Sequence, residues 1–438
     1  MTSTGFAPST DPCVHCGFCL PSCASYLALG SEMDSPRGRI HALKAIEAGE
    51  LTLDATVAAH FDSCLGCLAC VTACPSGVRY DQLIEATRPK LNATELRSPA
   101  QQLWRRLLFG LLPYPNRLRA LLRPLRAYAG TPLQALVRGM GLPRVLGPQL
   151  AAMEQLLPPL GDAAFRDQLP QVVPAQGERR YRVGLLLGCV QRVFDPEVNQ
   201  ATAAVLAANG IEVVIPRDQG CCGAVTHHQG EEAQTRALAA ALIRSFAASG
   251  PLDAVLVSAS GCGHSLKAYG RLLAGSDPAL AAAAAELAAK ALDVQEFLAR
   301  VGLRDSFKGA LQPLSHPDGS PASAEQPLTV AYHDACHMLH GQGISSAPRQ
   351  LLRAIPHVRL REPLEQGVCC GSAGIYNLVQ PAEAELLGAR KADDLRSTGA
   401  QIAVSANIGC SLQLRRHLDP ALPVLHPMQL LAQSAGLP

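Results

Sequence analysis

Short apolar runs alternate with helical patterns in the second half of the chain. The runs VGLLLG (183–188), IEVVIP (211–216) and AVLVSAS (254–260) have the length and composition of strands that are buried on both faces. Residues 199–209 show helical spacing between the first two runs, and Gly210 is suited to end that helix. Strands and helices that alternate in this order predict a parallel α/β sheet.

The same order of elements recurs farther along the chain. LTVAYH (328–333), HVRL (357–360) and IAVSAN (402–407) are the corresponding strand patterns. A segment rich in Pro, Ser and Gly, residues 308–327, separates the two copies. The chain therefore predicts a duplicated module of about 130 residues.

Helical spacing dominates the part of the chain that precedes these modules. Ile40, Leu43 and Ile46 are apolar on one helical face, and Gly49 is suited to the end of that helix. Residues 101–128 combine leucines with six arginines and no acidic residue. Such a segment suits an interfacial helix pair on an anionic membrane, or a helical linker packed on the modules or on a partner. We expect the packed linker.

These patterns divide the chain into four parts. We expect an N-terminal helical domain at 1–95, a helical linker at 96–180, and the two modules at 181–307 and 328–438. The expected fold class is a multidomain protein, α+β and α/β, in which a mainly helical domain precedes two duplicated parallel α/β modules.

Composition narrows the function classes. The 438 residues are 48% hydrophobic and 17% charged, with a formal net charge of +2, which argues against disorder and against a nucleic-acid binder. The start of the sequence lacks the features of a signal peptide, and no apolar run is long enough to span a membrane. The Ala-rich stretch 278–292 is interrupted by Glu286 and Lys290 and predicts a soluble helix. We expect a cytoplasmic protein, with attachment to the inner face of the membrane as an alternative.

The chain contains sixteen cysteines. In a reducing compartment, so many cysteines indicate metal binding or catalysis. Eight of them form two runs of the pattern C-x2-C-x2-C-x3-C: Cys13, Cys16, Cys19 and Cys23, then Cys64, Cys67, Cys70 and Cys74. This pattern is typical of proteins with two 4Fe–4S clusters, in which the fourth cysteine of each run binds the other cluster. Zinc or disulfides are the alternatives, but zinc sites do not need the third closely spaced cysteine.

We call this exchange of the fourth cysteine between the two runs the crossing, and it predicts the two ligand sets. The first cluster takes Cys13, Cys16, Cys19 and Cys74, and the second takes Cys64, Cys67, Cys70 and Cys23. The N-terminal domain is then ferredoxin-like, although Ala24 follows Cys23 where such runs usually have proline. Arg37 and Arg39 lie between the runs, where they either offset the negative charge of the clusters or are plain surface arginines.

The other eight cysteines repeat with the modules. Each module has one cysteine after its first strand, a Cys-Cys-Gly triplet after its second and a cysteine after its third: Cys189, Cys221, Cys222 and Cys262, then Cys336, Cys369, Cys370 and Cys410. The separations Cys189–Cys221 and Cys222–Cys262 are 32 and 40 positions, and their counterparts are 33 and 40. We call these units the first and second CCG modules.

The four cysteines of each CCG module should converge, because the carboxyl ends of parallel strands meet at one edge of the sheet. A further iron–sulfur cluster in at least one module, a redox dithiol and a purely structural role are the open alternatives. Nearby histidines are more often packed or surface residues than ligands, and none has clear ligand spacing: His227, His228, His264, His333 and His337.

Several motifs resemble the iron–sulfur subunit of bacterial glycolate oxidase, also called glycolate dehydrogenase. They are CVHCGFC, SPRGRI, CLGCLACVTACPSGVRY, YHDACHMLHGQG and CCGSAGIYNLVQP. CCG modules also occur in lactate-utilisation proteins, the anaerobic glycerol-3-phosphate dehydrogenase and heterodisulfide reductase. The last carries an additional cysteine where this chain has Ala259 and Asn407, which argues against its unusual double cluster.

The resemblance implies a role. A separate flavoprotein subunit would oxidise glycolate to glyoxylate, and this chain would relay electrons towards a quinone at the membrane or another acceptor. The equivalent subunit of a lactate or glycerol-3-phosphate dehydrogenase is the second hypothesis, and a structural zinc scaffold is the third. No G-x-G-x-x-G follows a strand, so a flavin or nicotinamide site of that type is not indicated in this chain.

Overall fold

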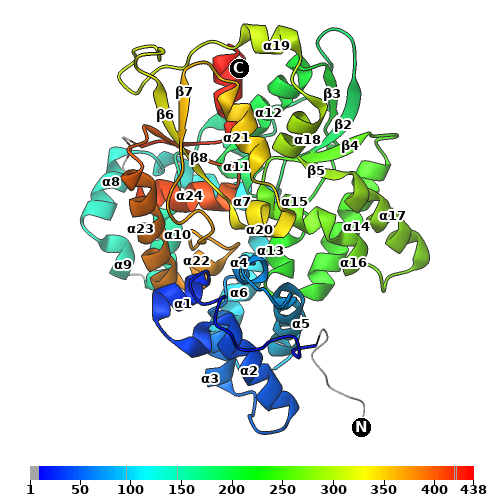
Figure 1. Cartoon of the computed structure of the whole chain (residues 1–438), viewed down its shortest axis with the longest axis vertical. Helices are drawn as coiled ribbons and strands as arrows, with labels where there is room; N and C mark the ends of the chain where they lie inside the picture. Colours follow the sequence, from blue (N-terminus) through cyan, green and yellow to red (C-terminus); the bar gives the residue numbers. More distant parts are fainter. Residues whose placement is uncertain (1–8, 95, 146, 419, 421) are drawn as a thin grey trace.

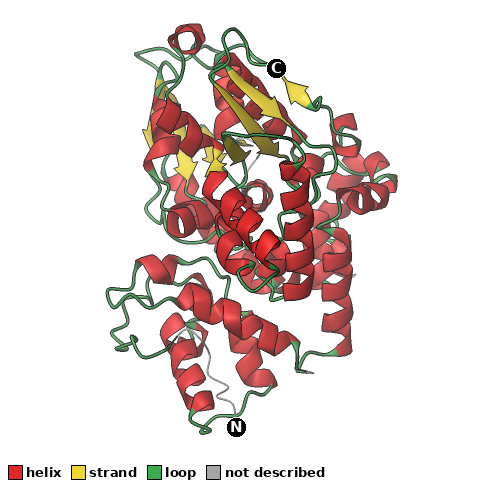
Figure 2. Cartoon of the chain, turned by 90° about the vertical axis from the view of Figure 1, so that its right-hand side faces the viewer, coloured by secondary structure: helices red, strands yellow, loops and turns green. Residues whose placement is uncertain are grey.

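Helices build the N-terminal part of the chain, and both sheets lie at the opposite end of the molecule (Figure 1). The computed structural model describes residues 9–94, 96–145, 147–418, 420 and 422–438. Turned by a quarter, the helical domain lies beneath the α/β part (Figure 2). The N-terminal domain comprises α1 (Ala24–Leu29), η1 (Glu32–Asp34), α2 (Pro36–Glu47), α3 (Ala55–Asp62), α4 (Ala69–Thr72) and α5 (Tyr80–Asn92).

The segment between the N-terminal domain and the modules is helical, as the composition of residues 101–128 suggested. It contains α6 (Pro99–Leu111), α7 (Pro115–Leu122), η2 (Pro124–Ala127), α8 (Pro132–Gly139), α9 (Leu142–Val145), α10 (Pro148–Gln155), η3 (Asp162–Phe165) and the short strand β1 (Val172–Val173). Five of these helices have proline as their first residue, where the missing N–H costs no hydrogen bond.

The first CCG module is a sheet covered by helices. Its elements are β2 (Tyr181–Leu186), α11 (Gln191–Phe194), α12 (Pro196–Ala208), β3 (Ile211–Val214), α13 (Ala224–His227), α14 (Glu232–Ala247), β4 (Ala254–Val257), α15 (Ser260–Lys267), α16 (Tyr269–Leu272), α17 (Pro278–Lys290), β5 (Ala291–Asp293), α18 (Val294–Val301) and α19 (Asp305–Ala310).

The second CCG module repeats this plan. Its elements are β6 (Leu328–His333), α20 (Cys336–Gln342), α21 (Ser346–Arg353), β7 (Val358–Arg361), α22 (Tyr376–Val379), α23 (Pro381–Ser397), β8 (Ile402–Ser405), α24 (Ile408–His417), β9 (Val424–Leu425) and α25 (Pro427–Ser434).

Sheet topology confirms the duplication. The parallel order β3-β2-β4-β5 of the first module corresponds to β7-β6-β8-β9 of the second. The strands β5 and β9 were not expected, because two or three residues carry too little periodicity to read. Nor was β1, which comes from the segment before the first module and pairs with β3 antiparallel.

The two modules pack against each other as related halves. One continuous apolar cluster contains Val183 and Leu256 of the first module together with Val330 and Val404 of the second. Backbone N–H of Ser260 donates across the junction to Ala406 O at 3.1 Å. The cysteine-bearing ends of both sheets are therefore held face to face.

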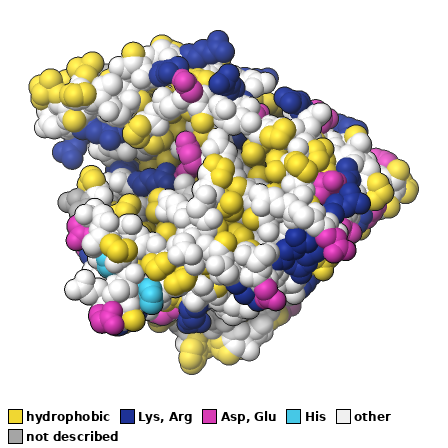
Figure 3. Space-filling view, turned by 90° about the horizontal axis from the view of Figure 1, so that it is seen from above, with side chains coloured by type: hydrophobic (Ala, Val, Ile, Leu, Met, Phe, Trp, Pro, Cys, Tyr) yellow, Lys and Arg dark blue, Asp and Glu magenta, His cyan; other side chains and the backbone are white. Residues whose placement is uncertain are grey.

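The surface carries no extended field of one charge on the face seen from above. Basic, acidic and apolar side chains are interspersed there (Figure 3), in keeping with the near-neutral net charge. Within the described ranges, no helix is both long and apolar enough to cross a membrane.

Candidate functional site

The first candidate site lies in the loop that precedes α1. Cys13, Cys16 and Cys19 of this loop and Cys74, which follows α4, line one cavity together with Arg37. Gly17 makes the tight curl possible, since its φ of +87° is favourable only for glycine. Cys16 is exposed, so this site lies at the protein surface.

The second candidate site lies deeper. Cys64, Cys67 and Cys70 line a cavity with Cys23, which stands at the start of α1. All four side chains are buried. Cys70 also contributes to the wall of the first cavity, so the two sites adjoin. The two cavities group the cysteines as the crossing predicts, and the ligand assignment itself stays a prediction.

A buried arginine gives the second cavity a positive wall. Arg39 is fully buried and donates to Ser25 Oγ at 3.1 Å and Ser63 Oγ at 2.7 Å. Its Nη1 has no hydrogen-bond partner, and its side chain lines the cavity with the four cysteines. A buried cationic nitrogen without a partner fits an anionic thiolate cluster in this cavity.

Arginine charge also acts on the thiols. Burial opposes ionisation, but the guanidinium groups of Arg39 and Arg88 hold the pKa of Cys64 below its usual range. Arg88 Nη2 donates to the carbonyl of Cys64 itself. Arg37, by contrast, pairs with Glu32 and donates to His15 O at 2.9 Å. Both arginines between the runs therefore line a cysteine cavity, Arg37 the first and Arg39 the second.

The thiols of each CCG module converge as expected. Cys189 Sγ lies 3.3 Å from Cys221 Sγ, and Cys336 Sγ lies 4.0 Å from Cys369 Sγ. One cavity between the modules is lined by seven of these cysteines: Cys189, Cys221, Cys222, Cys262, Cys336, Cys369 and Cys410. The sequence predicted convergence within each module but not that both modules would share one cavity.

This shared cavity lies beside the second N-terminal site. Cys67, Cys336 and Cys369 pack in the same apolar cluster. Tyr376 donates its hydroxyl to Ser63 O at 3.1 Å, and His337 Nε2 donates to Gly66 O at 3.0 Å. The second module thus holds the Cys64–Cys70 loop directly, which brings three groups of cysteines into a continuous series.

The histidines near the cysteines fall into two kinds. His228 and His264 pack against His337 where the N-terminal domain meets both modules, with ring centroids 4.5 and 4.8 Å from that of His337. Burial, with His264 nearby, lowers the pKa of His337 to about 3, so this packed ring is neutral. His333 differs, because one of its ring nitrogens, Cys370 Sγ and Cys410 Sγ lie within 4.8 Å of one another. The expectation that these histidines pack and do not act as ligands stays a prediction for His333.

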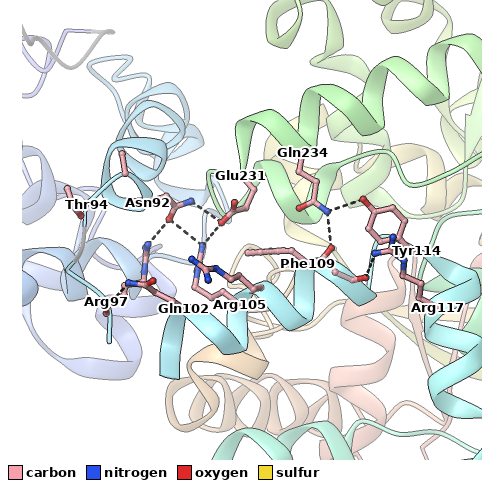
Figure 4. Close-up of a pocket in the computed structure, with 13 residues that line it drawn as sticks. Asn92, Thr94, Arg97, Gln102, Arg105, Phe109, Tyr114, Arg117, Glu231 and Gln234 are labelled. Carbon is pink, nitrogen blue, oxygen red and sulfur yellow. Dashed lines mark hydrogen bonds and ion pairs between the residues drawn. The ribbon is translucent and has the colours of Figure 1, made fainter. Parts of the chain in front are cut away.

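The linker helices pack on the modules. Trp104 Nε1 donates to Leu378 O at 3.1 Å, and Arg105 Nη1 donates to Gln229 Oε1 at 2.8 Å. A groove of 530 Å³ runs between α6 and α14 (Figure 4). Arg97, which pairs with Asp62 at 2.7 Å, lies at one end, and Gln234 bonds to Phe109 O at 2.9 Å towards the other. This segment therefore joins the N-terminal domain to both modules.

An ion-pair group fixes the N-terminal domain to the first module and gives a pH-dependent prediction. Glu85 of α5 lies 3.1 Å from His227 Nε2 and 2.7 Å from Arg271 Nη2. Burial opposes ionisation, but His227 and Arg271 together lower the pKa of Glu85 to about 2. A carboxylate with a lowered pKa stabilises the folded state above its unfolded value near 4.5, and this contribution is lost as the pH falls towards 2.

We expect Glu85→Gln to lower the free energy of unfolding by about 2 kcal/mol at pH 7. This loss is smaller than the full pKa shift implies, because the contacts are imperfectly aligned as hydrogen bonds. Denaturant unfolding of both proteins measures this difference, which should narrow between pH 4.5 and 2. Asp81→Asn is the control, since Asp81 pairs with the exposed Arg79 of its own domain. An equal loss in both variants at every pH would contradict the assignment.

Comparison with known domain families agrees with the two kinds of cysteine array. Residues 9–78 match the 4Fe-4S dicluster domain, and residues 183–267 and 330–415 each match a cysteine-rich domain. Residues 100–157 match the linker region of the glycolate oxidase iron-sulfur subunit. These matches confirm the expected fold class, the two-cluster domain and the duplicated modules.

Similar proteins extend over most of the chain. A probable glycolate oxidase iron-sulfur subunit of Bacillus subtilis is 35% identical over 97% of this chain and 94% of its own length. The glycolate oxidase iron-sulfur subunit of Escherichia coli is 32% identical over 92% and 89%. Lactate utilization protein A of Shouchella clausii is 29% identical, over 57% of this chain and 98% of its own length.

Proposed function

Because the chain belongs to the glycolate oxidase iron–sulfur subunit family, we propose that it is the electron-transfer subunit of a glycolate dehydrogenase complex. A flavoprotein subunit would oxidise glycolate to glyoxylate, and this chain would pass the electrons towards a quinone or another acceptor. The observation that supports this role most directly is the continuous series of three cysteine groups, from the surface loop to the cavity between the CCG modules.

The eight cysteines of the N-terminal domain form two sets of ligands, one for each cluster. We assign Cys13, Cys16, Cys19 and Cys74 to the outer site and Cys23, Cys64, Cys67 and Cys70 to the inner site. When bound, 4Fe–4S clusters accept and donate single electrons. Arg39 supplies a fixed positive charge at the inner site, and burial of the four inner cysteines keeps water away from it.

The outer site offers a place for the flavoprotein to dock. Val14 and Phe18 flank Cys16, and their side chains are 68% and 66% exposed. Large apolar side chains with this exposure, next to a redox site, favour contact with a partner protein. The partner would then face the outer site, and the inner site and the modules would lie behind it.

A membrane contact of the linker is a further part of this proposal. Leu133, Leu136 and Val145 of α8 and α9, and Met140 between the two helices, are more than half exposed. Residues 101–128 before them carry six arginines, of which Arg105 and Arg119 are buried. Apolar and arginine side chains together favour an anionic lipid surface near a quinone pool. Purified protein should then sediment with anionic liposomes at low salt, and failure to bind them would remove this part.

Co-purification with a flavoprotein partner tests the main proposal. The complex should reduce an artificial acceptor with glycolate faster than with D-lactate, and the chain alone should be brown with an EPR signal on reduction. Preference for lactate would favour the second hypothesis, which the match to lactate utilization protein A supports. A colourless protein loaded with zinc would instead favour a structural scaffold.

A further inference from the structure

The two CCG modules differ at one position beside their cysteines. Strand β6 ends at His333, which is in register with Ser405 of β8. The equivalent strand β2 ends at Leu186, which is in register with Val257 of β4 and packs in an apolar cluster. At this strand end, the second module therefore has an imidazole where the first has an apolar side chain.

The imidazole is aimed at two of these thiols. The nearest ring nitrogen of His333 and the sulfur atoms of Cys370 and Cys410 all lie within 4.8 Å of one another. All three side chains are buried, with exposed fractions of 2%, 1% and 4%. Across the described ranges, no other histidine, cysteine, aspartate or glutamate side chains gather in a group of three this close.

One ring nitrogen of His333 has a hydrogen-bond partner, and the other has none. Nδ1 lies 3.2 Å from Ser405 Oγ, a hydrogen bond that fixes the orientation of the ring. Nε2 is buried without any hydrogen-bond partner. When Nδ1 donates to Ser405, Nε2 carries the lone pair, which is the arrangement that metal-binding histidines adopt.

We propose that His333 Nε2 and the thiolates of Cys370 and Cys410 hold a single thiophilic metal ion, zinc or ferrous iron, in the second CCG module. Two thiolates and one imidazole are a common ligand set for such ions, and they leave one position open. Cys410 also lines the cavity between the modules, which gives a fourth ligand a route to the metal. Asn407 Nδ2 donates to Cys410 Sγ at 3.3 Å and orients that ligand.

This inference goes beyond the proposed electron transfer and does not rest on it. Leu186 leaves the first module without the nitrogen ligand, so the metal is assigned to the second module alone. The inference is also distinct from the two N-terminal clusters, whose eight cysteines do not form such a close group in the described residues. A single ion accounts for this compactness, because each ligand atom contacts the metal directly.

Metal analysis of the intact chain tests the proposal. We expect one zinc or iron per chain beyond the iron that is accounted for by labile sulfide. X-ray absorption at the edge of that metal should show both sulfur and imidazole ligands. A chain without this extra metal, or with extra iron matched by an equal amount of sulfide, would overturn the proposal whatever the behaviour of the variants.

Variants then locate the ion. His333→Leu makes the second module resemble the first and should abolish the extra metal while the iron and sulfide of the N-terminal domain are kept. Ser405→Ala, a milder change, should weaken metal retention about ten- to a hundredfold against a chelator, so the test does not depend on His333→Leu folding. Cys222→Ser, the counterpart of Cys370 in the first module, is the matched control and should keep the metal. Retention of the extra metal in both His333→Leu and Ser405→Ala would contradict the assignment.

Discussion

A Cys23→Ser, Cys67→Ser double variant is expected to keep about half of the N-terminal iron, as either single variant does. Both residues line the inner cavity, so both substitutions damage the same site. The outer set, with Cys74, remains complete in all three proteins. Iron and labile sulfide per chain, together with the EPR spectrum of the reduced protein, measure the remaining cluster.

The informative contrast is the double variant Cys23→Ser, Cys16→Ser. The two residues belong to one sequence run but line different cavities, so this variant should lose nearly all N-terminal iron. Without the crossing, the outcome would be reversed: Cys23 and Cys16 would share a cluster, and Cys23 and Cys67 would not. Near-complete loss in the Cys23, Cys67 variant with half retained in the Cys23, Cys16 variant would therefore refute the crossed assignment.

Much of this arrangement could be predicted because spacing carries local geometry. The C-x2-C-x2-C runs curl into concave loops by themselves, and the apolar runs at 183–188 and 328–333 had the length of buried strands. The duplication was readable because cysteine separations are preserved between copies. In each case, the signal lay within a few residues or in a repeat of the chain itself.

The remainder depended on contacts between distant segments. His333 shares its surroundings with Cys370 and Cys410 because β6 lies between β7, which precedes Cys370, and β8, which precedes Cys410. To predict the cavity shared by the two modules, one must know how the modules dock, and no sequence periodicity encodes that. For Arg39 the sequence left open a surface position and a role beside the clusters, and packing of α2 on the Cys64 loop buries it completely. Tertiary packing thus decided which polar residues became part of a site.

Arg39→Gln should be among the most damaging single substitutions outside the cysteines. The guanidinium is fully buried, donates to Ser25, Ser63 and the carbonyl of His60, and lies 3.7 Å from Asp34. Removing one partner of a buried charged network leaves the other uncompensated, at a cost of about 3–5 kcal/mol. Chemical denaturation of the cluster-loaded protein, followed by circular dichroism, measures this loss.

The same substitution separates an electrostatic role of Arg39 from a structural one. Tyr80, Cys64 and Cys23 raise the pKa of Arg39 despite its burial, so its positive charge is permanent at the inner site. Loss of that charge should lower the reduction potential measured for the inner site by on the order of 100 mV, since a nearby cation favours the more negative, reduced state.

Lysine at this position provides the decisive comparison. Arg39→Lys keeps the charge but cannot reproduce the planar set of hydrogen bonds, so it should lose stability while its potential stays close to that of the wild type. Arg37→Gln is the control on the same helix, because Arg37 pairs with Glu32 near the surface and does not line the inner cavity. Equal potentials in Arg39→Gln and Arg39→Lys would show that Arg39 acts through packing alone, and the assignment of an electrostatic role would fail.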